Sequence, residues 1–344
     1  MHILLVARIL GLFALLFSAT LVAPMLVAWV YQEPDLSPFV YPMAGSLAIG
    51  AAFSLAGLRG HAELGVRDGF LIVALFWLLV SALGAWPFVL GAGLTPMGAL
   101  FESASGFTTT GATVITDLDQ LPHSLLFYRQ QIQWLGGMGV VVLGLAVIPL
   151  LGIGGTQLYR AEAPGPLKDE KLTPRLLHTA RSLWLLYLLL TLACALGYWL
   201  AGMNGFDALA HSLSTVSTGG FSTRDESIGY YQSPAIEAVG VVFMLGHRVV
   251  EPVLIQAVWG YFAVYIITFG LLSLLMIHTG LDPVSAFTAV ATSINNLGPG
   301  LGEVAYNFAT VTDGGKLLAV IAMIMGRLEI FTILVLLSPS FWRG

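Results

Sequence analysis

Three segments of this chain share a spacing of residue types that suits cation binding by backbone carbonyl groups. Each segment begins with a helix-capping residue, and a glycine follows sixteen positions later. The three pairs are Thr95 and Gly111, Asn204 and Gly220, and Asp282 and Gly298. Thr, Asn and Asp favour helix starts, and glycine permits backbone angles that turn successive carbonyls toward one axis. In selective filters, rings of such carbonyls replace the hydration shell of a cation.

Other positions of the three segments recur as well. An alanine stands four residues after each cap, and a small hydroxyl residue stands ten after it. They are Ala99, Ala208 and Ala286, and Ser105, Ser214 and Thr292. This recurrence predicts an internal repeat. Pro96 and Pro283 occupy the favoured first helical position, and Asp207 is placed to complete a capping box with Asn204.

Each unit therefore predicts a short helix followed by an extended return segment. A helix of about three turns is ~18 Å long, so it would enter from the outer face and end near mid-membrane. Irregular backbone at that depth is tolerated only where it is buried or lines a water-filled cavity. The partly negative helix ends would favour a cation on the common axis. The alternative is an ordinary glycine turn below each amphipathic outer helix.

The elements that must position these segments are membrane helices. Of the 344 residues, 57% are hydrophobic and only 10% are charged, whereas soluble domains carry about 25% charged residues. We expect an all-α polytopic membrane protein with about eight transmembrane helices. The expected spans are Ile9–Val30, Phe39–Leu58, Gly69–Leu90, Leu125–Leu151, Leu177–Gly202, Pro234–Gly246, Leu254–Ile277 and Gly315–Leu337.

Composition and motifs exclude two function classes. No basic cluster interleaved with aromatic residues is present, which argues against nucleic-acid binding. The sequence holds no HExxH, GxSxG or Walker A motif, which argues against the common enzyme classes. No bound cofactor is expected.

Charge placement predicts the orientation in the membrane. Ten of the fourteen lysine and arginine residues fall on one side, which predicts that both termini are cytosolic. The polar segment Gly154–Arg181 then lies in the cytosol. It is either a solvated hairpin near anionic lipid or a docking surface for a cytosolic partner.

One expected span is too short. Pro234–Gly246 offers 13 residues before His247, which at 1.5 Å per residue cover about 20 Å of a ~30 Å hydrocarbon core. The interval between the recurring glycines is also shorter across this span. Gly111 and Gly220 are 109 residues apart, but Gly220 and Gly298 are only 78 residues apart.

Several long motifs resemble the TrkH branch of the Trk/Ktr/HKT superfamily of potassium transporters. The resemblance runs from near Gly69 to the C-terminus, and the first two helices resemble the extra N-terminal pair of that branch. The motifs are SGFTTTGATV (Ser105–Val114), QWLGGMGVVVL (Gln133–Leu143), QLYRAEAPGPLKDEKLTPR (Gln157–Arg175), STGGFSTRD (Ser217–Asp225), NNLGPGLGEVA (Asn295–Ala305) and GRLEIFTILVLLSPSFWR (Gly326–Arg343).

This resemblance implies four helix–pore loop–helix repeats around one path for K⁺ in the inner membrane. It also implies a homodimer that binds cytosolic nucleotide-binding regulatory subunits, with Arg327 below the filter facing the pore and an internal gate. An ion pair between Arg327 and Glu329 or Glu251 is the alternative. The implied filter residues are Thr109, Thr110, Gly111 and Ala112, Thr218, Gly219, Gly220 and Phe221, and Asn296, Leu297, Gly298 and Pro299.

The chain departs from that pattern because it has three pore loops rather than four. The break in spacing falls at Gly246–His247, so we expect the third repeat to be absent. The expected organisation is an N-terminal helix pair (1–58), a first pore repeat (59–153) and a cytosolic loop (154–181). A second pore repeat with a short second helix (182–246) and a last, fourth-type repeat (247–344) follow.

Two functions follow from this sequence. The first is potassium uptake by a pore-forming subunit of a Trk-type system, and the second is an internally deleted, non-conducting membrane scaffold. A third option is a partner chain that supplies the missing wall in a dimer. Glu102 and His211 share one position of the repeat, where packing or an outer-mouth hydrogen bond is expected rather than direct ion contact.

Overall fold

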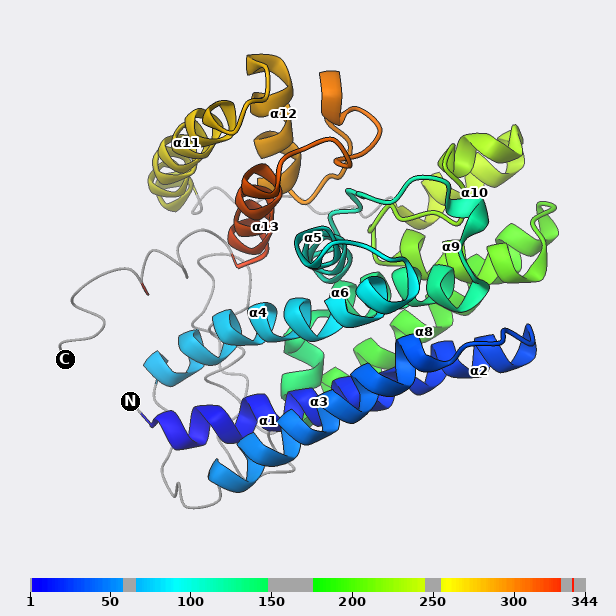
Figure 1. Cartoon of the computed structure of the whole chain (residues 1–344), viewed down its shortest axis with the longest axis horizontal. Helices are drawn as coiled ribbons and strands as arrows, with labels where there is room; N and C mark the ends of the chain where they lie inside the picture. The colour runs from blue at the N-terminus through cyan, green and yellow to red at the C-terminus, as the bar shows by residue number, and fades with distance from the viewer. Residues whose placement is uncertain (1, 58–65, 148–175, 245–254, 329–335, 337–344) are drawn as a thin grey trace.

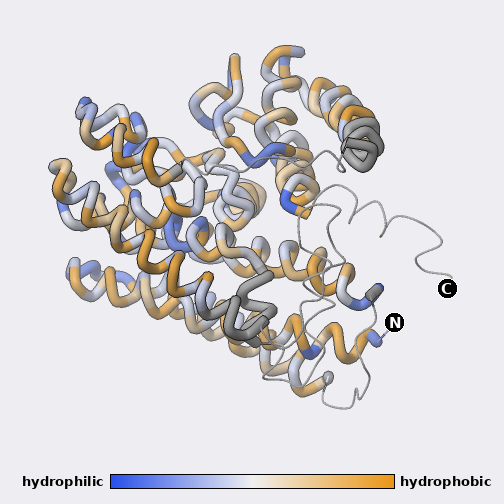
Figure 2. The backbone as a smooth tube through the Cα atoms, turned by 180° about the vertical axis from the view of Figure 1, so that it is seen from behind, coloured by the Kyte–Doolittle hydropathy of each residue, from blue (hydrophilic) through white to orange (hydrophobic). Residues whose placement is uncertain are grey.

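The computed structural model describes residues 2–57, 66–147, 176–244, 255–328 and 336, and these residues form helices and no strand. Figure 1 shows long helices that run side by side along the molecule, with shorter helices packed on them. Hydrophobic residues cover most of the long helices, and hydrophilic residues gather at helix ends and in loops (Figure 2). The expected all-helical class is confirmed for these residues.

The N-terminal part is a helical hairpin. The first expected span forms two helices, α1 (Ile3–Thr20) and α2 (Val22–Val30), which meet at Leu21. α3 (Ser37–Ala56) packs along α1. Gly11 and Gly50 permit the close approach, because a Cβ on Gly11 would lie 2.6 Å from the Ser54 amide nitrogen.

The helix–short helix–helix order then occurs three times. The first unit is α4 (Val66–Gly91), α5 (Pro96–Phe107) and α6 (His123–Val147). The second is α8 (Leu176–Leu200), α9 (Gly205–Val216) and α10 (Pro234–Met244). The last is α11 (Ile255–His278), α12 (Pro283–Ile294) and α13 (Asp313–Arg327). A short 3-10 helix follows each of α5, α9 and α12, at Leu118–Gln120, Ser227–Tyr231 and Gly302–Val304.

The three short helices have the predicted length and caps. Each has twelve residues. The Thr95 hydroxyl accepts from the Gly98 amide at 3.1 Å, and the Asn204 side chain accepts from the Asp207 amide at 2.8 Å. The Asp282 carboxylate accepts from the Val284 amide at 2.9 Å. The capping-box prediction needs a correction, because the Asp207 carboxylate accepts from the Asn204 side-chain amide and not from its backbone.

Removing a cap tests this helix start. We expect Thr95→Ala to lower stability by about 1 kcal/mol, because the Gly98 amide loses its acceptor. Thr95→Ser keeps the hydroxyl and is the matched control. The measurement is the thermal unfolding midpoint of the purified protein in detergent, and equal midpoints for the two variants would contradict the capping role.

The Asp282 cap adds a pH dependence. Hydrogen bonds from the Ser285 hydroxyl and amide hold the pKa of Asp282 below its usual value. The contribution of this carboxylate to stability is therefore present above the ordinary aspartate pKa of about 3.9 and is lost as the pH falls through the lowered value.

Four helical segments of the described chain are long and apolar enough to cross a membrane. They are Ile3–Val30, Ser37–Ala56, Arg67–Gly91 and Ser182–Leu200. Every one of the eight expected spans contains a helix, but the count of eight spans stays a prediction. α6 is interrupted at Gly139, where φ is 63° and ψ 174°. The described part of α10 has eleven residues, and the expected junction at Gly246–His247 lies outside the described residues.

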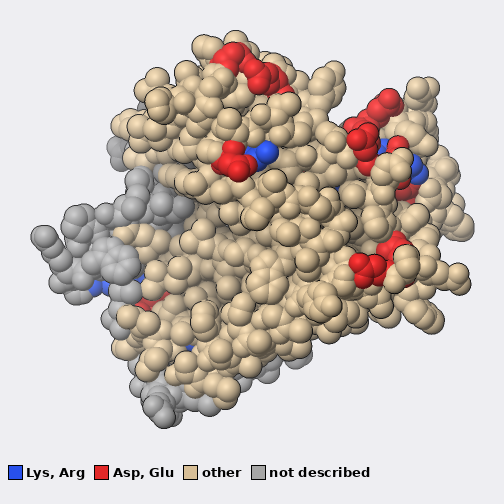
Figure 3. Space-filling model, in the orientation of Figure 1, with Lys and Arg blue, Asp and Glu red and all other residues tan. Residues whose placement is uncertain are grey.

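The three units are arranged as part of a ring, which is open between the second unit and the last. The last helix of one unit packs on the short helix of the next, as α6 packs on α9 and α13 packs on α5. In the described chain α10 packs mainly on α8 and α9, with neither α11 nor α12 among its main partners. Figure 3 shows the surface hollowed between the region over α12 and the region over α10.

Candidate ion-binding site

The three short helices end in the same backbone turn. The residues Thr109, Thr218 and Asn296 have φ values of 60°, 54° and 53°, and the glycines two positions later have 79°, 84° and 88°. In each unit an amide donates back to the recurring hydroxyl residue: Thr110 to the Ser105 carbonyl at 2.9 Å, Gly219 to Ser214 at 2.8 Å, and Leu297 to Thr292 at 2.9 Å. This pattern is the Schellman motif.

The turn contains strained backbone at a recurring position. A left-handed conformation is uncommon for residues other than glycine, and it is least favourable for a β-branched residue such as threonine. Thr109 and Thr218 adopt it nevertheless. Strain of this kind, about 1–3 kcal/mol per residue, persists where the surrounding structure enforces it and is concentrated at functional sites.

The segments after these turns converge. A Cβ placed on Gly111 would overlap the Gly219 carbonyl oxygen, and one on Gly298 would lie 2.7 Å from the Thr110 carbonyl oxygen. The Asn296 amide donates to the Thr110 hydroxyl at 2.9 Å. The first segment therefore lies between the second and the last. In the described structure no hydrogen bond joins residues 218–221 to residues 296–299.

Most backbone carbonyls of the expected filter residues accept no hydrogen bond in the described structure and are available to bind a cation. Two accept side-chain hydrogen bonds: Ala112 from the Ser105 hydroxyl at 2.5 Å, and Gly219 from the Gln133 amide at 2.7 Å. A carbonyl has two lone pairs, so one such bond does not exclude a cation. Among described residues, the carbonyls of Gly111, Gly220 and Gly298 accept no hydrogen bond.

A fully buried ion pair supports the first two segments. Arg129 and Glu102, 1% and 0% exposed, form an ion pair at 2.8 Å. Glu102 also accepts from the Val114 amide at 2.9 Å. Arg129 donates to the Ser222 carbonyl at 3.0 Å and lies 4.3 Å from the centre of the Phe221 ring. The pair therefore joins the return segments of the first two units.

His211 occupies the position equivalent to Glu102 in α9. Its Nδ1 lies 2.9 Å from the Asp207 carbonyl, and its Nε2 lies 3.0 Å from the Ser222 hydroxyl. A carbonyl only accepts, so Nδ1 carries the proton and Nε2 accepts from Ser222. The geometry of both residues fits the expected hydrogen-bonding role.

Arg327, at the end of α13, reaches the first unit. Its guanidinium donates to the Gly136 carbonyl, lies 3.5 Å from the Thr109 hydroxyl and 5.3 Å from the centre of the Trp77 ring. The alternative partners Glu329 and Glu251 lie outside the described residues. Arg327 thus contacts α6 and the start of the first filter segment.

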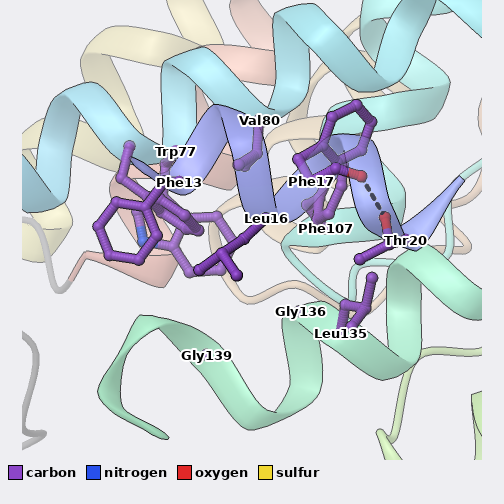
Figure 4. A pocket seen from close by; sticks show the side chains of 11 residues that line it. Phe13, Leu16, Phe17, Thr20, Trp77, Val80, Phe107, Leu135, Gly136 and Gly139 are labelled. Carbon is purple, nitrogen blue, oxygen red and sulfur yellow. Dashed lines mark hydrogen bonds between the residues drawn. The ribbon is translucent and has the colours of Figure 1, made fainter. Parts of the chain in front are cut away.

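An apolar cavity adjoins this contact (Figure 4). It has a volume of about 60 Å³ and is lined by α1, α4, α5 and α6, including Trp77, Gly136 and Gly139. Its one hydroxyl, on Thr20, donates to the Phe17 carbonyl at 2.7 Å. The cavity therefore offers no ligand set for a cation and is distinct from the ion-binding site.

The sequence did not single out the residues of α6 that hold the second segment. Gln133 and Arg129 are four positions apart, on one face of the helix. The predicted motif QWLGGMGVVVL begins at Gln133, but its partners are about ninety residues away in the chain. Polar residues within an apolar span were the available signal.

Comparison with known proteins gives the family. The family of TrkH cation transport proteins matches residues 39–247 and 245–343 of this chain. The chain belongs to the TrkH family. The Trk system potassium uptake protein TrkH of Salmonella typhimurium is 36% identical, with 100% of both chains covered. That of Vibrio parahaemolyticus is 37% identical, with 98% of this chain and 99% of the relative covered.

A solved structure agrees with this assignment. The crystal structure of the potassium transporter TrkH from Vibrio parahaemolyticus is similar with a TM-score of 0.85 and 34% identity over 100% of both chains. TrkH proteins are cation transporters and not enzymes, as expected from the absent enzyme motifs. The alignment with the Salmonella relative spans 482 positions, against the 344 residues of this chain.

Proposed function

We propose that the chain is the pore-forming subunit of a Trk-type potassium uptake system in the inner membrane, with both termini in the cytosol. The observation that carries this proposal is the convergence of three equal backbone turns, each with left-handed angles at the same two positions. The names of the TrkH relatives support potassium as the ion.

The ion site consists of the filter segments Thr109–Ala112, Thr218–Phe221 and Asn296–Pro299. Carbonyls of their central glycines replace water around K⁺. The three short helices are re-entrant pore helices, and their C-terminal ends add a partly negative potential at the site. Arg327 lies at the start of the first filter segment and supplies a positive charge on the inner side of the site.

The third pore repeat is absent in this proposal. Three observations support its absence: the two family matches meet at residues 245–247, the relatives align over 482 positions, and α10 packs on neither α11 nor α12 as main partner. The filter is then built on three sides, with its open side between the second and the last unit.

That open side favours a second candidate function, a non-conducting membrane scaffold of the same family. Three quarters of a ring leave one side of a dehydrated cation without protein ligands. Such a chain would still fold and bind partners. The partners in either case are a second copy of the chain and a cytosolic nucleotide-binding regulatory subunit, with residues 154–181 as the docking surface, most of which lies outside the described residues.

Growth of a potassium-uptake-deficient bacterial strain distinguishes the two functions. We expect the chain to restore growth at low potassium and uptake of Rb⁺, and we expect Gly220→Val to abolish both, because Gly220 has φ of 84°. Chain that reaches the membrane in normal amount yet gives neither growth nor Rb⁺ uptake would support the scaffold.

A further inference from the structure

One side chain of α6 forms two hydrogen bonds with the second filter segment. Gln133 is fully buried. Its Nε2 donates to the Gly219 carbonyl at 2.7 Å, and its Oε1 accepts from the Phe221 amide at 3.0 Å. A single amide group therefore fixes the two peptide units that flank Gly220.

This clamp determines the direction of the Gly220 carbonyl. A trans peptide unit is planar, with its N–H and C=O pointing in opposite directions. Because the Phe221 N–H points at Gln133, the Gly220 carbonyl of the same unit points away from α6. The preceding carbonyl, of Gly219, points toward Gln133. The two successive peptide units thus have opposite orientations, with Gly220 between them at φ of 84°.

Further contacts place the second filter segment directly against α6. A Cβ on Gly219 would lie 2.5 Å from the Gln133 Cδ, so the segment lies directly against the side chain. Four residues earlier on the same face, Arg129 donates to the carbonyl of Ser222, the residue after Phe221, at 3.0 Å. Among the described residues no glutamine binds the first segment in this way, and the Ser105 hydroxyl instead donates to the Ala112 carbonyl at 2.5 Å.

We propose that Gln133 is a positioning residue that sets the orientation of the Gly220 carbonyl, and thereby the preference of the site for K⁺ over Na⁺. This rests on the proposed potassium function of the three filter segments. Without the clamp the Gly219–Phe221 peptides are no longer held in one orientation, so the number of carbonyls directed at the ion, and with it the discrimination between K⁺ and Na⁺, changes.

Gln133→Leu and Gln131→Leu form a matched pair for the test. Both replace a buried glutamine of α6 by a residue of similar size. Gln131 donates to the Thr20 carbonyl of α1 at 2.8 Å and, in the described structure, makes no hydrogen bond to the filter segments. Each variant removes one buried side-chain amide, which makes one hydrogen bond at Gln131 and two at Gln133, and only Gln133→Leu removes hydrogen bonds to the filter.

The experiment measures the thermal unfolding midpoint of full-length protein in detergent as K⁺, Na⁺ or choline is titrated. We expect wild type and Gln131→Leu to be stabilised by K⁺ more than by Na⁺. In Gln133→Leu we expect the apparent K⁺ affinity to fall about ten-fold and the difference between K⁺ and Na⁺ to disappear. Gln133→Glu keeps the acceptor for the Phe221 amide, so we expect an intermediate loss.

The outcomes separate the two proposals. If wild type shows no K⁺-dependent stabilisation, the ion site of the proposed function is absent. If wild type responds to K⁺ and Gln133→Leu retains the same K⁺ affinity and the same discrimination against Na⁺, the role of Gln133 is wrong. An equal loss in Gln131→Leu would also overturn it, because the effect would then not depend on the filter clamp.

Discussion

Replacing Gly111 by alanine is expected to abolish selective K⁺ binding and transport. The new Cβ would overlap the Gly219 carbonyl oxygen, and the backbone at φ of 79° is unfavourable for any other residue. The two segments would have to separate, which moves the carbonyls of both units. We expect K⁺ affinity to fall at least about a hundred-fold, equal to about 2.8 kcal/mol. The measurement is a K⁺ titration of the thermal midpoint, together with Rb⁺ uptake in membrane vesicles.

Gly205→Ala is the matched control for this prediction. Gly205 begins α9 in the second unit, and a Cβ there would meet no heavy atom within 4 Å. We expect this variant to bind K⁺ as the wild type does. Normal K⁺ affinity in Gly111→Ala would show that the contact between the first and second filter segments does not determine the ion site.

Breaking the Glu102–Arg129 pair is expected to be the most destabilising substitution in the first unit. Arg129→Leu leaves a buried carboxylate with no cationic partner. Removal of one member of a buried pair typically costs about 3–5 kcal/mol. We expect a large fall in the thermal unfolding midpoint and loss of protein from the membrane during expression.

A double variant separates the ion pair from simple packing. In Glu102→Gln with Arg129→Leu no buried charge remains at the position of the pair, and the glutamine still accepts from the Val114 amide. We therefore expect the thermal unfolding midpoint of the double variant to be higher than that of Arg129→Leu and lower than that of the wild type. Equal midpoints for the double variant and Arg129→Leu would indicate that the lost packing of Arg129 over Phe221 dominates.

Local features of the fold follow from the sequence, because they depend on residues close together in the chain. Thr95, Asn204 and Asp282 start helices as expected for capping residues. The common offset of sixteen residues corresponds to a common conformation, which consists of a twelve-residue helix, a Schellman turn and a left-handed glycine two residues after the left-handed residue of that turn. The interruption of α6 at Gly139 and the two-part first span were not predicted, because hydropathy alone does not register a local bend.

The side chains that hold the filter segments in place could not be predicted in the same way. Gln133 contacts residues 86 and 88 positions later in the sequence, so its role depends on how α6 packs against α9. The left-handed Thr109 and Thr218 were also unexpected, since threonine ordinarily avoids that conformation. The glycine positions that shape each segment were visible in the sequence, whereas the side chains that fix the carbonyl directions became visible only with tertiary packing.

The most direct test of the central claim is the position of a bound cation. Anomalous diffraction from crystals soaked in Rb⁺ or Tl⁺, both of which substitute for K⁺, locates the ion without reference to transport. We predict a peak between the three filter segments, in contact with carbonyl oxygens of Gly111, Gly220 and Gly298. A structure of the intact chain with no peak there, at ion concentrations that saturate the K⁺-dependent stabilisation, would contradict the account.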